Sequence, residues 1–330
     1  MSFNESDDDN IDVQSDSIFF LVDSLIHRYF IHIPLIFIIF GIIGFIGNCF
    51  TFLQPTFRSN TCCIYSLCSS FVDIITLFVC LLQVYISDIH HIRLQSTSSK
   101  ILCKFQMFIF VFFPFWSLDF LLLSIIDRYA FTCSLTSYFH RITRFKMVPW
   151  IITISFIRSC ILSIHSPILS DLIPDIGCDT INPLATGILY IIINGLMQPI
   201  EMLIFVLLTY KNIWQSRQRV NIVRNTNPHR FRKRIIKMIS LQVLMTSLIS
   251  LQWIIMHTYI LITRNYSKST KQLSIETFIT TITLYLYYLN NVKSFYCSFF
   301  VSSMFRQTFI RALIKLLPEY LQPRRNVIHF

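Results

Sequence analysis

The chain has 330 residues, of which 54% are hydrophobic and only 14% are charged. A soluble domain of this length rarely carries so few charges, so the composition excludes an ordinary soluble protein and favours an integral membrane protein. The formal net charge of +11 does not indicate a nucleic-acid partner, because the basic residues gather mostly in segments that a membrane topology places on one side.

Seven apolar segments follow one another along the chain. Each is long enough to cross a bilayer core of about 30 Å as a helix that rises about 1.5 Å per residue. The segments between them are short and polar. The sequence therefore predicts an all-α membrane protein, a seven-transmembrane helix bundle with spans at 32–54, 64–87, 101–126, 148–169, 185–210, 235–262 and 275–303.

The charges outside the spans predict the orientation. Residues 1–23 contain acidic residues and no basic one, whereas residues 211–237 contain basic residues and no acidic one. By the positive-inside rule the loop 211–237 is cytoplasmic, and counting spans backward places the N-terminus outside the cell. The acidic segment lacks the features of a cleaved signal peptide, so we expect an uncleaved multi-pass protein of the plasma membrane.

Polar residues interrupt the first two spans. Asn48 follows three glycines spaced by three residues, a pattern that lets helices approach closely. The amide is either a functional partner or an incidental part of a packing face. Asp73 is an ionisable group near the middle of the second span, where it is costly unless paired or hydrated, so it is a functional candidate.

The third span carries the most specific pattern. Cys103 stands at its polar head, and 128 − 103 = 25 residues later Arg128 is the centre of the triplet Asp127-Arg128-Tyr129. At this spacing, on the third of seven spans, the pattern resembles the third transmembrane helix of rhodopsin-like (class A) G-protein-coupled receptors. The resemblance covers residues 32–317 and is to a divergent, orphan or peptide-receptor-like member.

The resemblance implies a receptor in which an extracellular ligand biases two arrangements of the bundle and a heterotrimeric G protein binds around Arg128. It implies a coupling switch made of Asp127, Arg128, Tyr129 and Tyr296. It also implies an intramembrane polar core that holds a sodium ion in many members of the family, to which Asn48, Asp73 and Ser117 correspond.

The seventh span departs from the family pattern. If Tyr296 is the motif tyrosine, Lys293 stands where the family has a proline. We expect Lys293 to pair with Asp73 and replace the sodium ion, and breaking such a buried pair should cost about 3–5 kcal/mol. The alternative is that Lys293 extends to the inner interface. Light sensing is disfavoured, because Lys293 lies too near the cytoplasmic end to hold retinal.

The sixth span keeps only part of the family's switch. Trp253 is present, but the proline that follows it in the family is not. Trp253 is therefore a candidate toggle, with ordinary packing as the alternative. The acidic residue that usually restrains Arg128 from this span is also missing, which predicts raised basal activity.

The cysteines and glycosylation sequons fit the predicted sides. Of ten cysteines, only Cys103 and Cys178 fall outside the cell, so we expect a disulfide that ties the second outer loop over the bundle; two free thiols are the alternative. Asn4 and Asn265 each begin an Asn-x-Ser sequon on the predicted outer side, which makes them candidate glycosylation sites.

The chain then divides into four parts. Apolar residues at helical spacing after the seventh span predict an amphipathic helix on the inner leaflet, which Pro318 ends. The parts are an acidic extracellular N-terminus (1–31), the seven-transmembrane domain (32–304), the membrane-surface helix (305–317) and a cytoplasmic tail (318–330).

No enzyme signature, metal-ligand cluster or cofactor motif is found in the sequence, so we expect no enzymatic activity and no cofactor. The acidic N-terminus favours a basic or amidated peptide, such as a neuropeptide, over a lipid or small metabolite as the ligand. Two alternatives stay open. One is a receptor-like protein without G-protein coupling; the other is a secondary transporter that uses Asp73, Asp119, Glu201 and Lys293, although the absence of an inverted repeat argues against it.

Overall fold

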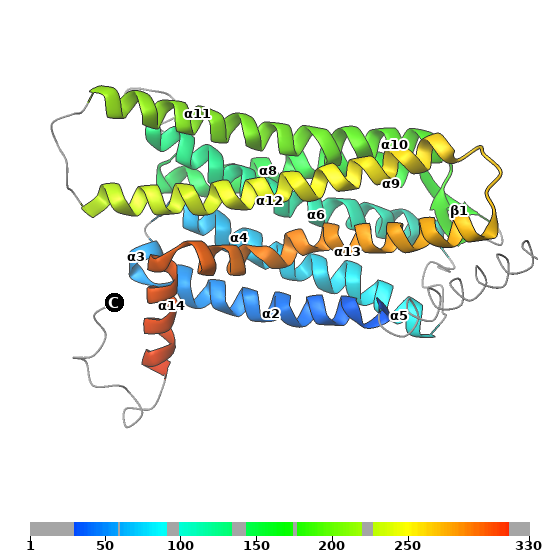
Figure 1. Ribbon diagram of the computed structural model, residues 1–330, viewed down its shortest axis with the longest axis horizontal. Helices are drawn as coiled ribbons and strands as arrows, with labels where there is room; N and C mark the ends of the chain where they lie inside the picture. The colour runs from blue at the N-terminus through cyan, green and yellow to red at the C-terminus, as the bar shows by residue number, and fades with distance from the viewer. Residues whose placement is uncertain are drawn as a thin grey trace, which may run out of the picture.

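Long helices run side by side through the molecule (Figure 1). The computed structural model describes residues 30–58, 60–90, 99–133, 143–173, 177–219 and 227–316. The long helices are α2 (Ile33–Phe52), α4 (Thr61–Thr76), α6 (Lys100–Thr132), α8 (Val148–Ser163), α11 (Gln198–Arg219), α12 (Asn227–Thr263) and α13 (Thr270–Val301).

Short helices extend or connect the long ones. A π-helical turn, η2 (Leu77–Leu81), joins α4 to α5 (Leu82–His90), and a second, η4 (Ile191–Met197), joins α10 (Pro183–Tyr190) to α11, so each pair forms one continuous helical run. The remaining short elements are η1 (Phe30–His32), α3 (Pro55–Arg58), η3 (Phe145–Met147), α9 (His165–Ile168) and α14 (Ser303–Leu316).

Side chains fix where several of these helices begin. Asn60 precedes α4 and accepts a hydrogen bond from the backbone N–H of Cys62 at 3.2 Å. Ser269 precedes α13 and accepts one from the N–H of Gln272 at 3.3 Å. Such caps satisfy backbone N–H groups that have no partner within the helix, so they determine the first residue of each helix.

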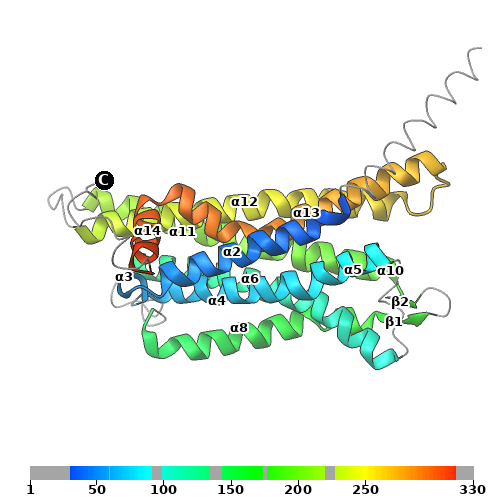
Figure 2. The ribbon, with the colours of Figure 1, turned by 90° about the horizontal axis from the view of Figure 1, so that it is seen from below.

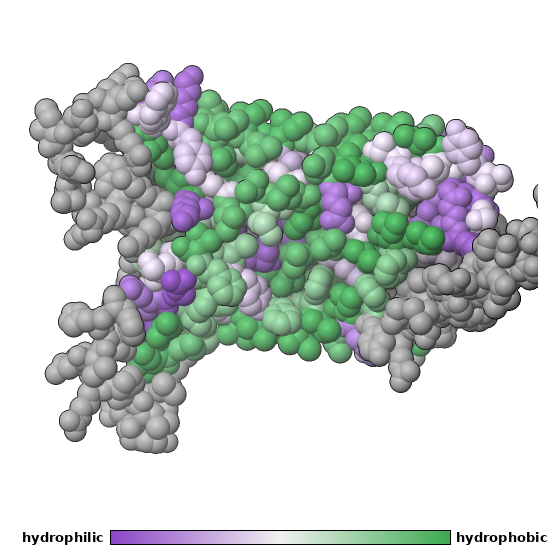
Figure 3. Space-filling model, viewed as in Figure 1, coloured by the Kyte–Doolittle hydropathy of each residue, from purple (hydrophilic) through white to green (hydrophobic). Residues whose placement is uncertain are grey.

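Six helical segments of the described chain are long and apolar enough to cross a membrane. They are Phe30–Phe52, Thr61–Ser87, Lys100–Thr132, Phe145–Ile168, Pro183–Gln215 and Ile236–Thr263. Hydrophobic residues cover much of the middle of the face seen in Figure 3, and hydrophilic residues gather toward its two ends. The protein is therefore an all-α, multi-pass membrane protein.

The segment expected to form the seventh span is helical but less apolar than the other six. It forms α13, which packs against α2 and α12 but is not among the six apolar segments. The reason is its more polar composition, and several of its polar residues are buried in the bundle: Thr283, Asn290, Asn291, Lys293 and Ser298. The count of seven spans therefore remains a prediction.

A disulfide and a β-hairpin mark one end of the bundle. Strands β1 (Ser170–Ile173) and β2 (Gly177–Thr180) pair antiparallel, with Leu172 opposite Cys178. Cys178 forms the expected disulfide with Cys103 at the start of α6. Gly177 opens β2 with a φ of +97°, a conformation that residues with a side chain rarely adopt. The hairpin is thus held to α6, and we call this end the disulfide end.

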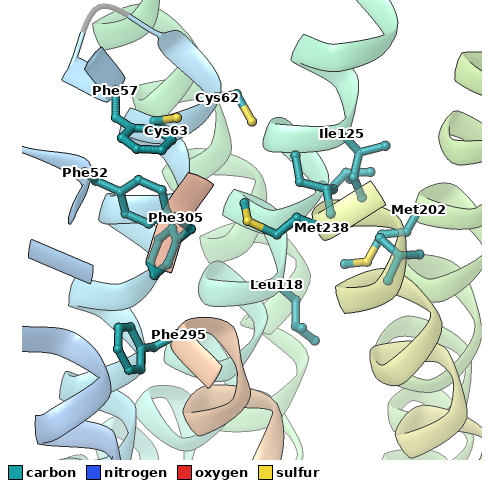
Figure 4. Close-up of a cluster of buried hydrophobic side chains, with 13 residues drawn as sticks. Phe52, Phe57, Cys62, Cys63, Leu118, Ile125, Met202, Met238, Phe295 and Phe305 are labelled. Carbon is teal, nitrogen blue, oxygen red and sulfur yellow. The ribbon is translucent and has the colours of Figure 1, made fainter. Parts of the chain in front are cut away.

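Aromatic packing closes the opposite end, where α14 turns away from the bundle (Figures 1 and 2). The ring of Phe305 in α14 lies 5.4 Å from that of Phe52 and 5.8 Å from that of Phe295, measured between centroids. Phe57 packs on the same group, and Figure 4 shows Phe52, Phe57 and Phe305 gathered together. These contacts fix the start of α14 against the end of the bundle, which we call the α14 end.

Candidate functional site

The Asp127–Arg128 pair is buried near the α14 end of α6. Asp127 is 2% exposed and Arg128 is 4% exposed. The Arg128 guanidinium, through Nη2, lies 3.2 Å from Oδ2 of Asp127, so the two form an ion pair. The hydroxyl of Thr61 donates a hydrogen bond of 2.5 Å to Oδ1 of the same carboxylate.

Asn60 holds Arg128 a second time. The Nη2 group of Arg128 donates a hydrogen bond to Oδ1 of Asn60, the same atom that caps the start of α4. The guanidinium is therefore attached to both α6 and the first turn of α4. We call Asn60, Thr61, Asp127 and Arg128 the Arg128 pocket. Its positive charge is matched by one carboxylate, and both are sealed from the surroundings.

The two tyrosines expected in the coupling switch lie in different places. The ring of Tyr129 packs against Phe205 of α11, with centroids 5.7 Å apart. Tyr296 instead turns toward α2, where its hydroxyl donates to the backbone carbonyl of Phe40 at 3.0 Å. The structure thus places Asp127 and Arg128 in one pocket and directs Tyr296 to the α2 face of α13.

A polar core joins four helices deeper in the bundle. Oδ1 of Asp73 accepts hydrogen bonds from the hydroxyl of Ser117 and from Nδ2 of Asn291, the latter at 2.8 Å. Ser70, three residues before Asp73 in α4, accepts a hydrogen bond of 2.7 Å from the side-chain amide of Asn48 in α2. The expected residues of the polar core are therefore buried hydrogen-bonding groups between α2, α4, α6 and α13.

Lys293 does not pair with Asp73. Among the described residues it forms no ion pair, and its ammonium donates instead to the side-chain and backbone oxygens of Asn290. It is 6% exposed, so it does not extend to the interface either. Asn291 takes the place beside Asp73. Since successive residues turn by about 100° on a helix, Asn291 and Lys293 leave α13 about 200° apart, and it is Asn291 that points at the carboxylate.

Asn291 was not identified from the sequence. When Tyr296 is aligned with the family's tyrosine, the neighbouring Val292 falls at the position of the family's asparagine. An asparagine one position away, inside an apolar helix, was nevertheless a usable signal, because an amide in a membrane span needs a partner on a neighbouring helix.

Trp253, the candidate toggle, belongs to an aromatic cluster between α10, α12 and α13. Its ring centroid lies 4.1 Å from that of His257 and 4.9 Å from that of Tyr287. Tyr190 packs on the same ring at 5.9 Å. The contacts show a buried tryptophan at a junction of three helices, where either packing or movement of α12 would involve it.

A third polar cluster was not identified from the sequence as a unit. Arg158 of α8 forms ion pairs with Asp119 of α6 at 3.0 Å and with Glu201 of α11 at 2.6 Å. From the sequence, Asp119 and Glu201 had a role only in the transporter alternative, and Arg158 had none. A lone arginine in an apolar segment was the signal, because such a residue requires a partner or a functional role.

The disulfide end carries exposed charges. Lys100 lies 3.4 Å from Asp171, and the N–H of Leu172 donates a hydrogen bond of 2.8 Å to the same carboxylate. That backbone hydrogen bond, helped by the charge of Lys100, lowers the pKa of Asp171. Asn265 is exposed at this end, as a glycosylation site must be, while Asn4 lies outside the described residues.

No group of three or more metal-ligating side chains occurs among the residues that the structure describes. No protein-family model matches the chain, and no curated protein matches it. The functional argument therefore depends on the chain's own residues and on the arrangement of its helices.

Proposed function

We propose that the protein is a divergent rhodopsin-like G-protein-coupled receptor of the plasma membrane. It spans the bilayer seven times, with α13 as the seventh span, and its N-terminus is extracellular. An extracellular ligand acts at the disulfide end, and a heterotrimeric G protein binds at the α14 end. The single observation that carries this proposal is the Arg128 pocket.

The Arg128 pocket supports a switch because the charged guanidinium is buried in this arrangement and would become accessible in another. Arg128 is buried and held by Asp127 and Asn60, so it is inaccessible to a partner while these contacts persist. Movement of α6 relative to α4, or loss of the Asp127 charge, would release the guanidinium. A ligand that binds the released arrangement more tightly than the closed one shifts the population toward it.

The distribution of charge supports the orientation. The C-terminal end of α11, the N-terminal end of α12 and α14 lie at the same end of the bundle (Figure 1). Residues 211–237, which include both helix ends, are basic without an acidic residue, and α14 adds Arg306, Arg311 and Lys315. By the positive-inside rule this end is cytoplasmic, which puts the Arg128 pocket where a G protein could reach it.

The ligand class follows from the charge at the other end. Residues 1–23 are acidic, and β2 presents the exposed Asp179 close to the disulfide. The acidic residues of 1–23 and Asp179 favour a basic or amidated peptide by charge complementarity. A neuropeptide is therefore the ligand we propose, ahead of a lipid or a small metabolite.

One observation favours a second candidate, a receptor-like protein without G-protein coupling. Tyr296 donates its hydrogen bond to α2 rather than toward Arg128, and Lys293 is held by Asn290 on its own helix. A seventh helix that does not contribute to the pocket would weaken the link between ligand and G protein. The same experiment distinguishes the two.

The experiment measures nucleotide exchange on a panel of G proteins in cells that display each variant at the surface. Asp127→Asn removes the charge that holds Arg128, so we expect exchange without any ligand. Adding Arg128→Ala should abolish it, whereas Arg264→Ala, an exposed arginine at the disulfide end, should leave it unchanged.

The outcomes separate the hypotheses. If Asp127→Asn reaches the surface and activates no G protein, the proposal that the protein couples to a G protein is wrong. The alternative of a receptor-like protein without coupling then takes its place. If exchange persists without Arg128, the pocket is not the coupling site. A ligand-independent ion flux that requires Asp119 or Glu201 would instead identify a transporter.

A further inference from the structure

The cluster of Asp119, Arg158 and Glu201 lies between three helices that are distant in sequence. Arg158 reaches Asp119 through Nη1 and Glu201 through Nη2, so one guanidinium joins α6, α8 and α11. We call these three side chains the Arg158 triad. None of the three belongs to the Arg128 pocket or to the polar core around Asp73.

The triad lies near mid-membrane depth. Asp119, Arg158 and Glu201 fall within three residues of the centres of their respective apolar segments, Lys100–Thr132, Phe145–Ile168 and Pro183–Gln215. Because the hydrocarbon core is about 30 Å thick, either membrane surface is about 15 Å away. Lipid headgroups and bulk water therefore do not reach these charges from the interface.

The inner and outer parts of the triad differ in how far they are exposed at the surface of the bundle. Asp119 is 1% exposed and accepts further hydrogen bonds from Ser159 at 2.9 Å and from Gln198 at 3.3 Å. The side chains of Arg158 and Glu201 are 31% and 34% exposed. Among the described residues, Glu201 has hydrogen bonds only from Arg158. The triad is complete on its inner side and open on its outer side.

The open side lies on an apolar face. Figure 2 places α8 at the edge of the bundle, so its outer surface faces away from the other helices. Exposed isoleucines flank Arg158 and Glu201 in sequence on both helices: Ile154, Ile157 and Ile161 on α8, and Ile200 and Ile204 on α11. We call this surface the α8–α11 face. It is a mainly apolar surface, on which the side chains of Arg158 and Glu201 are partly exposed.

The charges of the triad do not balance. Two carboxylates share one guanidinium, which leaves an excess of one negative charge when all three are ionised. Charged groups exposed to hydrocarbon are costly and mark functional positions. One further cation at mid-membrane depth would neutralise this excess charge.

We propose that the α8–α11 face docks a transmembrane helix of a partner protein that carries a lysine or arginine near the middle of its span, and that this cation pairs with Glu201. The depth selects a protein helix over a lipid headgroup. A second copy of this chain fits poorly, because its own triad would bring another excess negative charge. The surrounding isoleucines provide the packing surface, as in other helix pairs within membranes.

The test uses the purified full-length protein in lipid vesicles, with energy transfer to synthetic membrane-spanning peptides. The peptides are leucine–alanine helices that differ only in the central residue: lysine, leucine or glutamate. We expect the lysine peptide to bind about ten-fold more tightly than the leucine peptide, and the glutamate peptide to bind no better than leucine.

Two substitutions connect the effect to the triad. Glu201→Gln should remove the preference for lysine, while Glu276→Gln, the same change in a carboxylate paired with Lys268 at the disulfide end, should retain it. Ile157→Trp leaves every charge in place but adds bulk to the α8–α11 face, so it should weaken binding of the lysine peptide several-fold. It supplies an independent test if Glu201→Gln does not fold.

Three results would overturn the proposal. The first is equal binding of the lysine and leucine peptides to the wild type. The second is a lysine preference that survives both Glu201→Gln and Ile157→Trp. The third is self-association of labelled wild-type copies that depends on Glu201, which would assign the face to a second copy instead of a basic partner helix.

Discussion

Arg128 and Arg158 each bind an aspartate of α6, yet their surroundings differ. The Arg128 pocket has one carboxylate for one guanidinium, and both are sealed at the end of the bundle. The Arg158 triad has two carboxylates for one guanidinium and opens on an apolar outer face. A buried ion pair with no net charge can keep its arginine inaccessible until the helices move. A partly exposed cluster with an excess negative charge can instead bind a cationic partner.

The largest effect should come from removing the arginine of the triad. Arg158→Leu leaves Asp119 buried without its cation, and removing one member of a buried pair costs about 3–5 kcal/mol. We therefore expect a marked fall in the thermal unfolding temperature of the detergent-solubilised protein.

A double variant checks this interpretation of the triad. Asp119→Asn combined with Arg158→Leu should recover part of the lost stability, because the buried charge is gone as well. If the two changes are simply additive, the carboxylate and the guanidinium do not interact as the distance suggests.

The carboxylate of Asp73 adds a third case to the comparison: it is buried, and its hydrogen-bond donors among the described residues are neutral. Asn291→Ala removes a donor to Asp73 and should destabilise the protein by about 1.5–3 kcal/mol, the range for hydrogen bonds to charged groups. Lys293→Met should be close to neutral or stabilising, because it removes a buried cation without an ion-pair partner. Thermal unfolding of both variants measures the difference, and a larger loss for Lys293→Met would restore the Lys293–Asp73 pair.

A smaller effect should appear on loosening the Arg128 pocket without touching its charges. Asn60→Ser keeps an oxygen that can cap α4 but is too short to hold Arg128 as asparagine does. Losing about 1 kcal/mol of hydrogen bonding between Arg128 and residue 60 raises the population of the state with Arg128 released about five-fold. Ligand-free nucleotide exchange should rise by that factor while the unfolding temperature changes little. A fall in exchange would show that Asn60 supports the released state rather than the closed one.

The smallest effect should come from the exposed pair at the disulfide end, where solvent screens the charges. The pKa of Asp171 is lowered from its ordinary value of 3.8, so its carboxylate stabilises the hairpin above that value and the contribution is lost as the pH falls through the folded-state pKa. Hydrogen exchange at the Leu172 amide should therefore accelerate on acidification. The acceleration should disappear in Asp171→Asn, and its persistence there would assign it to another group.

The sequence predicted the parts of this protein that depend on local composition. Apolar segments of sufficient length identified all six spans that the structure supports, and the positions of Cys103 and Cys178 predicted their disulfide. The Asp127-Arg128 pair was expected from its place in the third span. The spans and the charge pair depend on neighbouring residues and on the thickness of a bilayer, and the disulfide follows from the side of the membrane on which each cysteine falls, so the sequence alone is enough to find them.

The tertiary structure decided which polar groups meet inside the bundle. Asp119, Arg158 and Glu201 belong to three helices and meet only because those helices pack with these faces together. Asn291 rather than Lys293 reached Asp73 because of the rotation of α13 about its own axis. A helix can turn any face toward its neighbours at almost no cost in backbone hydrogen bonding, so composition fixes that a segment spans the membrane, and packing alone fixes what each charge binds.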